Sequence, residues 1–205
     1  MSIKLAVVYY SSTGVNHQLA EWAAEAGKEA GAEVKLLRAA ELAPQSVIDR
    51  MPLWKAHAEA TEHIPVVTTD DIVWADAIIF STPTRFGVMA SQLKQFLDTT
   101  GGIFFEGKTA NKVVSAMSSA ENPHGGQEAT ILSLYTMMYH WGAIVVTPGY
   151  TDASIFAAGG NPYGTSVTVD AQTKSMKEDV RDAVAHQTKR VVEVATWLKQ
   201  GRLQH

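Results

Sequence analysis

The chain contains no cysteine among its 205 residues. This absence excludes disulfides, thiolate metal sites, iron–sulfur clusters and catalysis by a cysteine nucleophile. The chain also has no run of basic residues, and its formal net charge of -4 at pH 7 gives no support for nucleic acid binding. No apolar run is long enough to span a bilayer, and the first residues contain no signal-peptide core, so we expect a cytoplasmic protein without membrane insertion.

What the chain does contain is an alternation of short apolar runs with amphipathic segments. Hydrophobic residues make up 46% of it and charged residues 19%, a composition that predicts one domain over residues 1–205. Strands are predicted at residues 3–10, 33–38, 77–82, 112–118 and 143–146. Helices separate most of them, and irregular excursions are predicted near residues 41–69 and 147–169. The pattern indicates an α/β protein with a doubly wound, five-stranded parallel sheet and helices on both faces. The flavodoxin-like strand order 2-1-3-4-5 is one of the common orders of such sheets, and it is the order that we expect here.

The predicted helices begin and end at recognisable residues. The first follows Gly14, and a helix over residues 91–99 is expected to end at Gly101-Gly102. Further helices are predicted over residues 127–141 and from about Val180 to Gly201, and a weak helical segment lies within residues 54–62.

The junction between the first strand and the first helix is rich in hydroxyl residues. Backbone N–H groups and the positive end of a helix dipole favour an anion at such a junction, and hydroxyls add donors. The junction contains neither GxGxxG nor GxxxxGK[ST], which leaves a mononucleotide, with FMN as the leading candidate. The predicted phosphate loop comprises Ser11, Ser12, Thr13, Gly14, Val15 and Asn16. Serine and threonine are also favoured as helix N-caps, so capping alone would explain the same composition.

Two other loops are predicted at the same edge of the sheet, where ligands bind in this strand order. After the third strand, Pro83 restrains a turn and Gly87 permits close backbone approach. Phe86 can present an apolar edge to a planar ring; the alternative is that Phe86 belongs to the core and that Arg85 only forms a surface ion pair. The loop over residues 118–128 contains proline, asparagine and paired glycines, which fit either a ring-binding segment or an ordinary loop.

Six motifs occur together in a definite order. They are Tyr9-Tyr10-Ser11 with Gly14, TPTRFG at residues 82–87, FLDTTGG at 96–102, GGQE at 125–128, His140 before Trp141-Gly142, and NPYG at 161–164. In this order the chain resembles, over nearly its whole length, the WrbA-type NAD(P)H:quinone oxidoreductases, a flavodoxin-like family. The combination of PTRFG with FLD-x-TGG is specific to that family, whereas the hydroxyl-rich first loop is shared with flavodoxins in general.

The resemblance implies noncovalently bound FMN, NAD(P)H as electron donor, a quinone as acceptor, and a homotetramer whose sites are built from several subunits. Beyond the phosphate loop, it implies cofactor contacts from Pro83, Thr84, Arg85, Phe86, Gly87, Ser118, Ser119, Ala120, Glu121, Asn122, Pro123, His124 and Gly125. His140 matches a flavin-side histidine that reaches a neighbouring subunit's site. Phe104 stands where the family often has a tryptophan that stacks on the quinone, and Thr13 stands where relatives have a tyrosine associated with the nicotinamide donor.

With the implied cofactor, we expect a ping-pong reaction. A hydride passes from the nicotinamide to the flavin, and two electrons then pass to a quinone in the same pocket. We expect backbone N–H groups after the third strand, together with Arg85, to stabilise the negative charge of the reduced flavin. His140 is the candidate to donate a hydrogen bond or a proton to the quinone, because histidine titrates near neutrality.

No metal site is predicted. The remaining histidines show no ligand spacing with a carboxylate. They are His17, His57, His63, His124, His186 and His205.

Two other functions stay open on the sequence alone. A flavodoxin-like one-electron carrier would share the first loop, but such carriers usually have a strongly acidic face, which a net charge of -4 does not suggest. An FMN-binding regulatory or interaction protein would retain the cofactor as a structural ligand.

Overall fold

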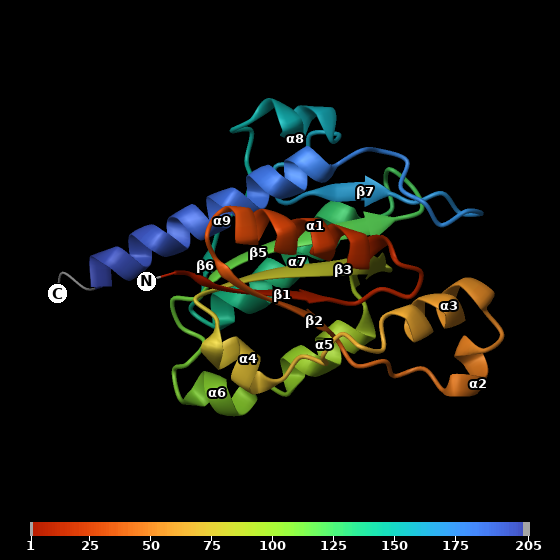
Figure 1. Ribbon diagram of the computed structural model, residues 1–205, viewed down its shortest axis with the longest axis horizontal. Coiled ribbons are helices and arrows are strands. Elements are labelled where there is room, and N and C mark those ends of the chain that lie inside the picture. The colour runs from red at the N-terminus through yellow and green to blue at the C-terminus, as the bar shows by residue number, and fades with distance from the viewer. Residues whose placement is uncertain (1, 203–205) are drawn as a thin grey trace.

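A parallel sheet forms the centre of the molecule in a computed structural model that describes residues 2–202 (Figure 1). Its path is β2-β1-β3-β5-β6, made of strands Glu33–Arg38, Lys4–Tyr9, Ala77–Arg85, Val113–Ala120 and Ile144–Val145. Neighbours along this path are parallel throughout. The predicted order of the five principal strands is therefore confirmed. His205 lies outside the described residues.

Two short strands that the sequence did not reveal enlarge the sheet, so that seven strands lie within the described residues. β4 (Val88–Met89) pairs antiparallel with the end of β3. β7 (Ser166–Thr168) pairs with the end of β5, whereas β6 pairs with its beginning. Because β3 occupies the opposite edge of β5, β6 and β7 lie in succession along one edge. The excursion predicted at residues 147–169 thus interrupts the last strand, and it contains helix α8 (Ala153–Ala157).

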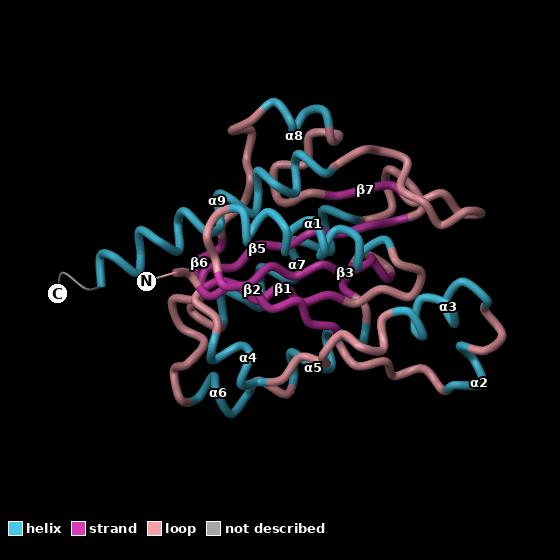
Figure 2. Tube along the Cα trace, viewed as in Figure 1, coloured by secondary structure: helices cyan, strands magenta, loops and turns pink. Residues whose placement is uncertain are grey.

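Helices cover both faces of the sheet (Figure 1 and Figure 2). Helices α1 (Val15–Glu29) and α9 (Arg181–Arg202) pack on one face, and α4 (Thr69–Trp74), α5 (Ser91–Asp98) and α7 (Gln127–His140) pack on the other.

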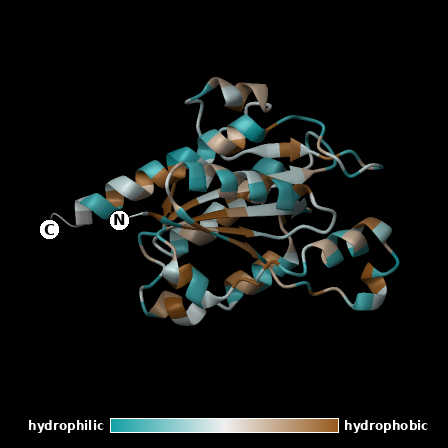
Figure 3. Ribbon diagram, in the orientation of Figure 1, coloured by the Kyte–Doolittle hydropathy of each residue, from teal (hydrophilic) through white to brown (hydrophobic). Residues whose placement is uncertain are grey.

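Much of the central sheet is coloured toward the hydrophobic end of the scale in Figure 3, and buried apolar residues of its strands lie on both faces. In β1, Leu5 and Val7 belong to the core beneath α1 and α9, whereas Ala6 and Val8 belong to the core on the opposite face. This alternation follows from the two-residue period of a strand, and burial of both faces is what a parallel sheet requires.

Three local expectations need correction or refinement. The helix predicted over residues 91–99 was expected to end at Gly101-Gly102, but α5 ends at Asp98 and the two glycines begin a further short helix, α6 (Gly101–Phe105). Neither glycine adopts the left-handed conformation that commonly ends a helix. The excursion predicted at residues 41–69 contains two short helices, α2 (Gln45–Ile48) and α3 (Pro52–Ala60). The strand predicted to end at Thr82 continues to Arg85.

None of the helices within residues 2–202 combines the length and the apolar character that crossing a membrane would need.

Candidate functional site

A cavity of about 520 Å³ lies at the carboxyl ends of β1, β3 and β5. All three predicted loops contribute to its lining, which comprises Ser11, Ser12, Thr13, Val15, Asn16, Met51, Pro83, Thr84, Arg85, Phe86, Ser119, Ala120, Glu121, Asn122, Gly125, Val169 and Lys174. A groove of about 550 Å³ beside α9 has a slightly larger volume, but none of the predicted residues lines it. The shared lining by three separate segments identifies the first cavity as the candidate site.

The phosphate loop leads into a helix whose N-terminus has no side-chain cap. Gly14 is the N-cap residue, with φ of 101°, and no side chain bonds to the first-turn N–H groups in the manner of a cap. The hydroxyl of Ser11 instead accepts a 3.0 Å hydrogen bond from the N–H of Gly14. The hydroxyls therefore do not serve as helix caps, and the N–H groups of the first turn stay available for an anion.

Asn16 fixes the phosphate loop to the two other strands. Its side chain is 1% exposed, donates to Ser81 Oγ over 3.1 Å, and accepts from Ser119 Oγ over 2.6 Å. Ser81 Oγ in turn donates to the backbone carbonyl of Asn16 over 2.9 Å. Since all three side chains are buried, their mutual hydrogen bonds satisfy polar groups that water cannot reach.

The motif TPTRFG forms a β-hairpin and not the predicted loop. β3 and β4 pair Arg85 with Val88, so Phe86-Gly87 is a two-residue turn. Both turn residues have positive φ, 53° and 82°, which is the pattern of a type I′ turn. Phe86 is fully exposed at the tip and so does not belong to the core. Arg85 is also exposed and donates to the carbonyl of Thr84.

The hairpin rests on the N-terminus of α7. Thr130 Oγ1 donates to Thr84 Oγ1 over 2.7 Å. Gly126, the N-cap residue of α7, has φ of 95°, and a Cβ there would lie 3.1 Å from Cα of Gly87. This close approach positions the predicted ring-binding turn against the segment that follows β5.

The third predicted segment is partly strand. Ser118, Ser119 and Ala120 belong to β5, and Ser118 is fully buried, outside the cavity lining, with no hydrogen-bond partner for its hydroxyl among the described residues. The loop that follows has exposed Pro123 and His124, which do not line the cavity either. Gly14 and Gly87 also lie outside the lining and act through the backbone turns that they permit.

Three lining residues were not predicted. Met51 comes from the N-cap of α3, and Val169 and Lys174 come from the segment after β7. Lys174 forms an ion pair with Glu121, which also lines the cavity. Asp170 stabilises this segment, because its carboxylate accepts from the N–H groups of Gln172 and Thr173.

A half-buried carboxylate holds the segment that carries Met51. Glu41 accepts hydrogen bonds from the side chains of Tyr10, Trp54 and Gln92, and from the N–H groups of Leu42 and Ala43. Burial by itself would raise the pKa of Glu41, but these hydrogen bonds outweigh it and hold the pKa below the ordinary range. The excursion is therefore attached at one ionised group to Tyr10, which directly follows β1, and to Gln92 of α5.

His140 and Phe104 lie away from the cavity. α7 begins beside the cavity at Gln127 and ends at His140, which is exposed near the edge where the strands begin. Figure 1 places α6, and with it Phe104, near that same edge. Within one chain, neither residue is brought to the site.

The residues at the cavity fit FMN, the cofactor expected from the sequence. The uncapped start of α1 offers N–H donors for a terminal phosphate, and the hydroxyls of Ser11, Ser12 and Thr13 surround it. The hairpin and the end of β5 border the rest of the cavity. Within residues 2–202, no cluster of three histidine or carboxylate side chains offers a metal site.

Comparisons with known proteins support the same conclusion. Residues 3–157 match the family model described as NADPH-dependent FMN reductase. The chain is 52% identical over 196 residues to the NAD(P)H dehydrogenase (quinone) of Deinococcus radiodurans, covering 96% of this chain and 97% of that relative. It is 39% identical over 206 residues to the protein of the same description from Geotalea daltonii, covering 98% and 100%.

Solved structures agree on the fold. The WrbA-like flavodoxin of Agrobacterium tumefaciens superposes with a TM-score of 0.63 at 23% identity, over 96% of this chain and 99% of that one. The fold is therefore flavodoxin-like, as predicted.

Proposed function

Because the chain belongs to the NADPH-dependent FMN reductase family, we propose that it is a cytoplasmic, FMN-dependent oxidoreductase that transfers two electrons from NAD(P)H to quinones. The names of the curated relatives support this enzyme over a one-electron carrier or a regulatory protein. The observation that carries the proposal is the cavity itself, where the uncapped start of α1, the β3–β4 hairpin and the end of β5 converge.

Different residues of the chain contact the phosphate and the ring of FMN in this proposal. The N–H groups at the start of α1 and the hydroxyls of Ser11, Ser12 and Thr13 bind the phosphate of FMN, and Asn16 keeps this loop in register with β3 and β5. The hairpin residues Pro83 to Gly87 border the ring, and the exposed guanidinium of Arg85 is near enough to the cavity to favour negative charge there. Held there, FMN would supply two-electron redox chemistry in a ping-pong cycle, in which the nicotinamide gives up a hydride and the quinone receives two electrons and two protons.

His140 and Phe104 act, in this proposal, in the site of a neighbouring subunit of a homotetramer. Both are exposed at the edge of the sheet remote from their own cavity. Around them, Phe105 is 88% exposed, Tyr139 64% and Leu132 41%. Apolar side chains of this size on α6 and on the outer face of α7 support burial against another subunit.

A steady-state assay tests the activity. The purified full chain, supplied with FMN, should oxidise NADH or NADPH with benzoquinone as acceptor much faster than the same concentration of free FMN. A double-reciprocal plot at several quinone concentrations should give parallel lines. Turnover no faster than that of free FMN would overturn the proposal.

A second measurement tests the subunit arrangement. His140→Ala should lower kcat, because the proposal places this side chain in a neighbouring subunit's site, and light scattering of the wild-type protein should give the molar mass of a tetramer. A monomeric protein with full activity would contradict the assignment of His140 and Phe104.

A further inference from the structure

A pair of histidines lies directly behind the phosphate loop. His57, on α3, approaches Gly14 so closely that a Cβ at Gly14 would lie 3.6 Å from its Nδ1. The ring of His57 is 5.4 Å from that of His17 on α1, and His17 is 4.9 Å from the ring of Tyr9. The helix of the excursion thus brings an ionisable side chain to the back of the turn at which FMN's phosphate binds in the proposed function.

The loop itself supplies no positive charge. Residues 11–16 contain neither lysine nor arginine. Of the two cationic side chains that line the cavity, Lys174 is paired with Glu121, and Arg85 stands on the hairpin and donates to the carbonyl of Thr84. A phosphate dianion at the start of α1 would therefore be balanced only by N–H groups, hydroxyls and the helix dipole.

At neutral pH and without a bound anion, the side chains of His57 and His17 are both uncharged. Burial, and secondly the neighbouring His17, lower the pKa of His57 to about 4. Burial also lowers the pKa of His17, although the carboxylate of Glu21, 3.6 Å from its Nε2, acts in the opposite direction. That Nε2 atom is buried and has no hydrogen-bond partner among the described residues.

The other charged or titratable side chains near the pair are those of His63, Arg38 and Glu41. His63 follows α3, and its effect on His17 is to disfavour a second proton. Arg38 on β2 donates to the carbonyls of Ile64 and Glu62, and with Glu41 it lines a small cavity of about 50 Å³ beside Tyr9 and His57. Glu41 is already engaged by five donors, so it does not supply His57 with a counterion.

We propose that His57 is a further residue of the phosphate site, which takes up a proton from solvent when FMN binds and so supplies the positive charge that the loop lacks. This inference rests on the FMN binding proposed above. A dianion within a few ångströms favours the charged form of an imidazole, and partial burial keeps the interaction from being screened.

The sign of the resulting pH dependence follows from linkage. The pKa of His57 is higher in the complex than in the free protein, so binding takes up a proton between the two pKa values. FMN affinity is then greatest at low pH and is lost as the pH rises through the pKa of the complex. Riboflavin has the same ring and no phosphate, so its affinity should not vary in this way.

The experiment measures dissociation constants of the full chain for FMN and riboflavin by quenching of flavin fluorescence. The range is about pH 7 to about 9, where a phosphomonoester with a second pKa of about 6 is mostly a dianion. For FMN we expect Kd to rise by up to about tenfold per pH unit through the titration. Calorimetry in two buffers of different ionisation enthalpy should detect the proton taken up with FMN.

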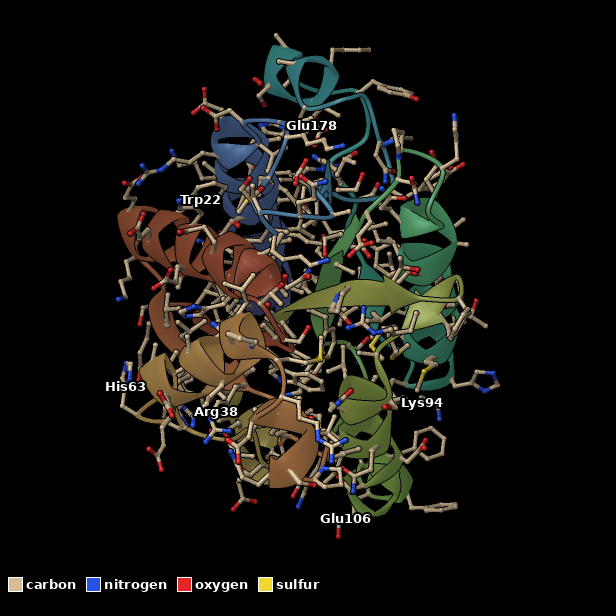
Figure 4. The ribbon with its side chains drawn as sticks, turned by 90° about the vertical axis from the view of Figure 1, so that its right-hand side faces the viewer. Trp22, Arg38, His63, Lys94, Glu106 and Glu178 are labelled. Atoms are coloured by element: carbon tan, nitrogen blue, oxygen red, sulfur yellow. The ribbon has the colours of Figure 1, made fainter. Side chains whose placement is uncertain are left out.

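Two variants test whether His57 causes the pH dependence of FMN affinity. His57→Gln should bind FMN at low pH as weakly as the wild type does at high pH, with no pH dependence. His63→Gln is the matched control, because His63 is exposed at the outer margin of the molecule (Figure 4), and it should keep the wild-type slope.

The outcomes are distinct. An FMN affinity that does not change with pH, or a slope that survives in His57→Gln, would overturn the role of His57 and leave the cofactor assignment intact. A wild-type protein that binds neither FMN nor riboflavin would overturn the proposed function as well.

Discussion

The hydroxyl of Ser119 donates a 2.6 Å hydrogen bond to the side-chain oxygen of Asn16, across 103 positions of sequence. Asn16 lies in the first turn of α1, and Ser119 lies at the end of β5. The same asparagine bonds Ser81 on β3, so one side chain ties together the three segments that surround the cavity.

Replacing Asn16 by alanine should destabilise the protein. The change removes the side-chain hydrogen bonds to Ser81 and Ser119 and leaves the buried hydroxyl of Ser119 without its partner, which costs about 1–3 kcal/mol, whereas Ser81 keeps its bond to the backbone carbonyl of residue 16. Urea unfolding of the protein without added FMN measures the loss. Gln18→Ala is the control, because Gln18 bonds only Glu21 of the same helix among the contacts described, and its unfolding midpoint should hardly move. Equal stability of the two variants would mean that Asn16 does not tie the segments together.

Gly126→Ala should damage both stability and cofactor binding. The residue has positive φ, and a Cβ would stand 3.1 Å from backbone of the hairpin, so we expect a loss of about 1–2 kcal/mol and weaker FMN binding. Gly102→Ala provides the contrast, since Gly102 is helical with open space around it and should gain up to about 1 kcal/mol. Thermal unfolding and FMN titration together test the pair. Unaltered FMN affinity in Gly126→Ala would separate the hairpin from the cofactor site.

Glu41→Gln should lower the free energy of unfolding most at neutral pH. The folded-state pKa of Glu41 lies below the ordinary value, so its contribution is complete above the unfolded pKa of about 4.3 and is lost as the pH falls through the folded pKa. At pH 7 we expect the variant to be less stable by about 1–3 kcal/mol.

The difference in stability between the wild type and Glu41→Gln should therefore become smaller at acid pH. Urea unfolding midpoints of both proteins, measured at successive pH values, test this. Glu59→Gln, at an exposed position of the same excursion, should show little difference at any pH. A gap for Glu41→Gln that stays constant down to acid pH would contradict the ionised state of Glu41.

Phe86→Asn should raise stability and impair turnover. Asparagine tolerates the left-handed conformation that phenylalanine adopts in this turn, so the hairpin should gain about 1 kcal/mol. If the exposed ring borders the quinone, its loss should raise KM for benzoquinone. Phe86→Leu keeps an apolar side chain and the strained turn, and its KM should stay closer to that of the wild type. An unchanged KM in Phe86→Asn would show that the ring has no part in substrate binding.

The sequence predicted the regular part of the fold well. The bounds of β2 agree with the predicted 33–38, and the order of the principal strands is confirmed, because apolar runs between amphipathic helices are strong local signals. The enzyme class and the cofactor expected from the motifs agree with the family match and the curated relatives.

The errors share a physical cause, which is that tertiary pairing overrides local preference. Pro83 was interpreted as a turn residue, yet it lies in β3 opposite Ser119. The last residue of β3 that pairs with β1 is Ser81, so beyond Ser81 this edge of β3 has no neighbouring strand. Proline, which has no N–H to donate, is tolerated at such an open edge. β7 is only three residues long within a glycine-rich stretch, and nothing local distinguishes it from a loop.

The predicted residues that line the cavity follow strands, whereas the lining residues that were not predicted come from irregular segments. Met51 and Lys174 reach the cavity only because Glu41 and Asp170 hold their segments in place. Proline after Met51 is a sign of a helix start, but no local feature of either residue indicates which part of the sheet it faces.

The interrupted last strand has a practical use. Since β6 and β7 each keep their own pairing with β5, the stretch between them can vary in length without moving any strand. Gly159 and Gly160 stand in that stretch with no atoms near the position of a side chain. An affinity tag or a fluorescent reporter inserted between these two glycines would leave the flavin pocket and both chain ends untouched, which makes this the place to engineer the protein.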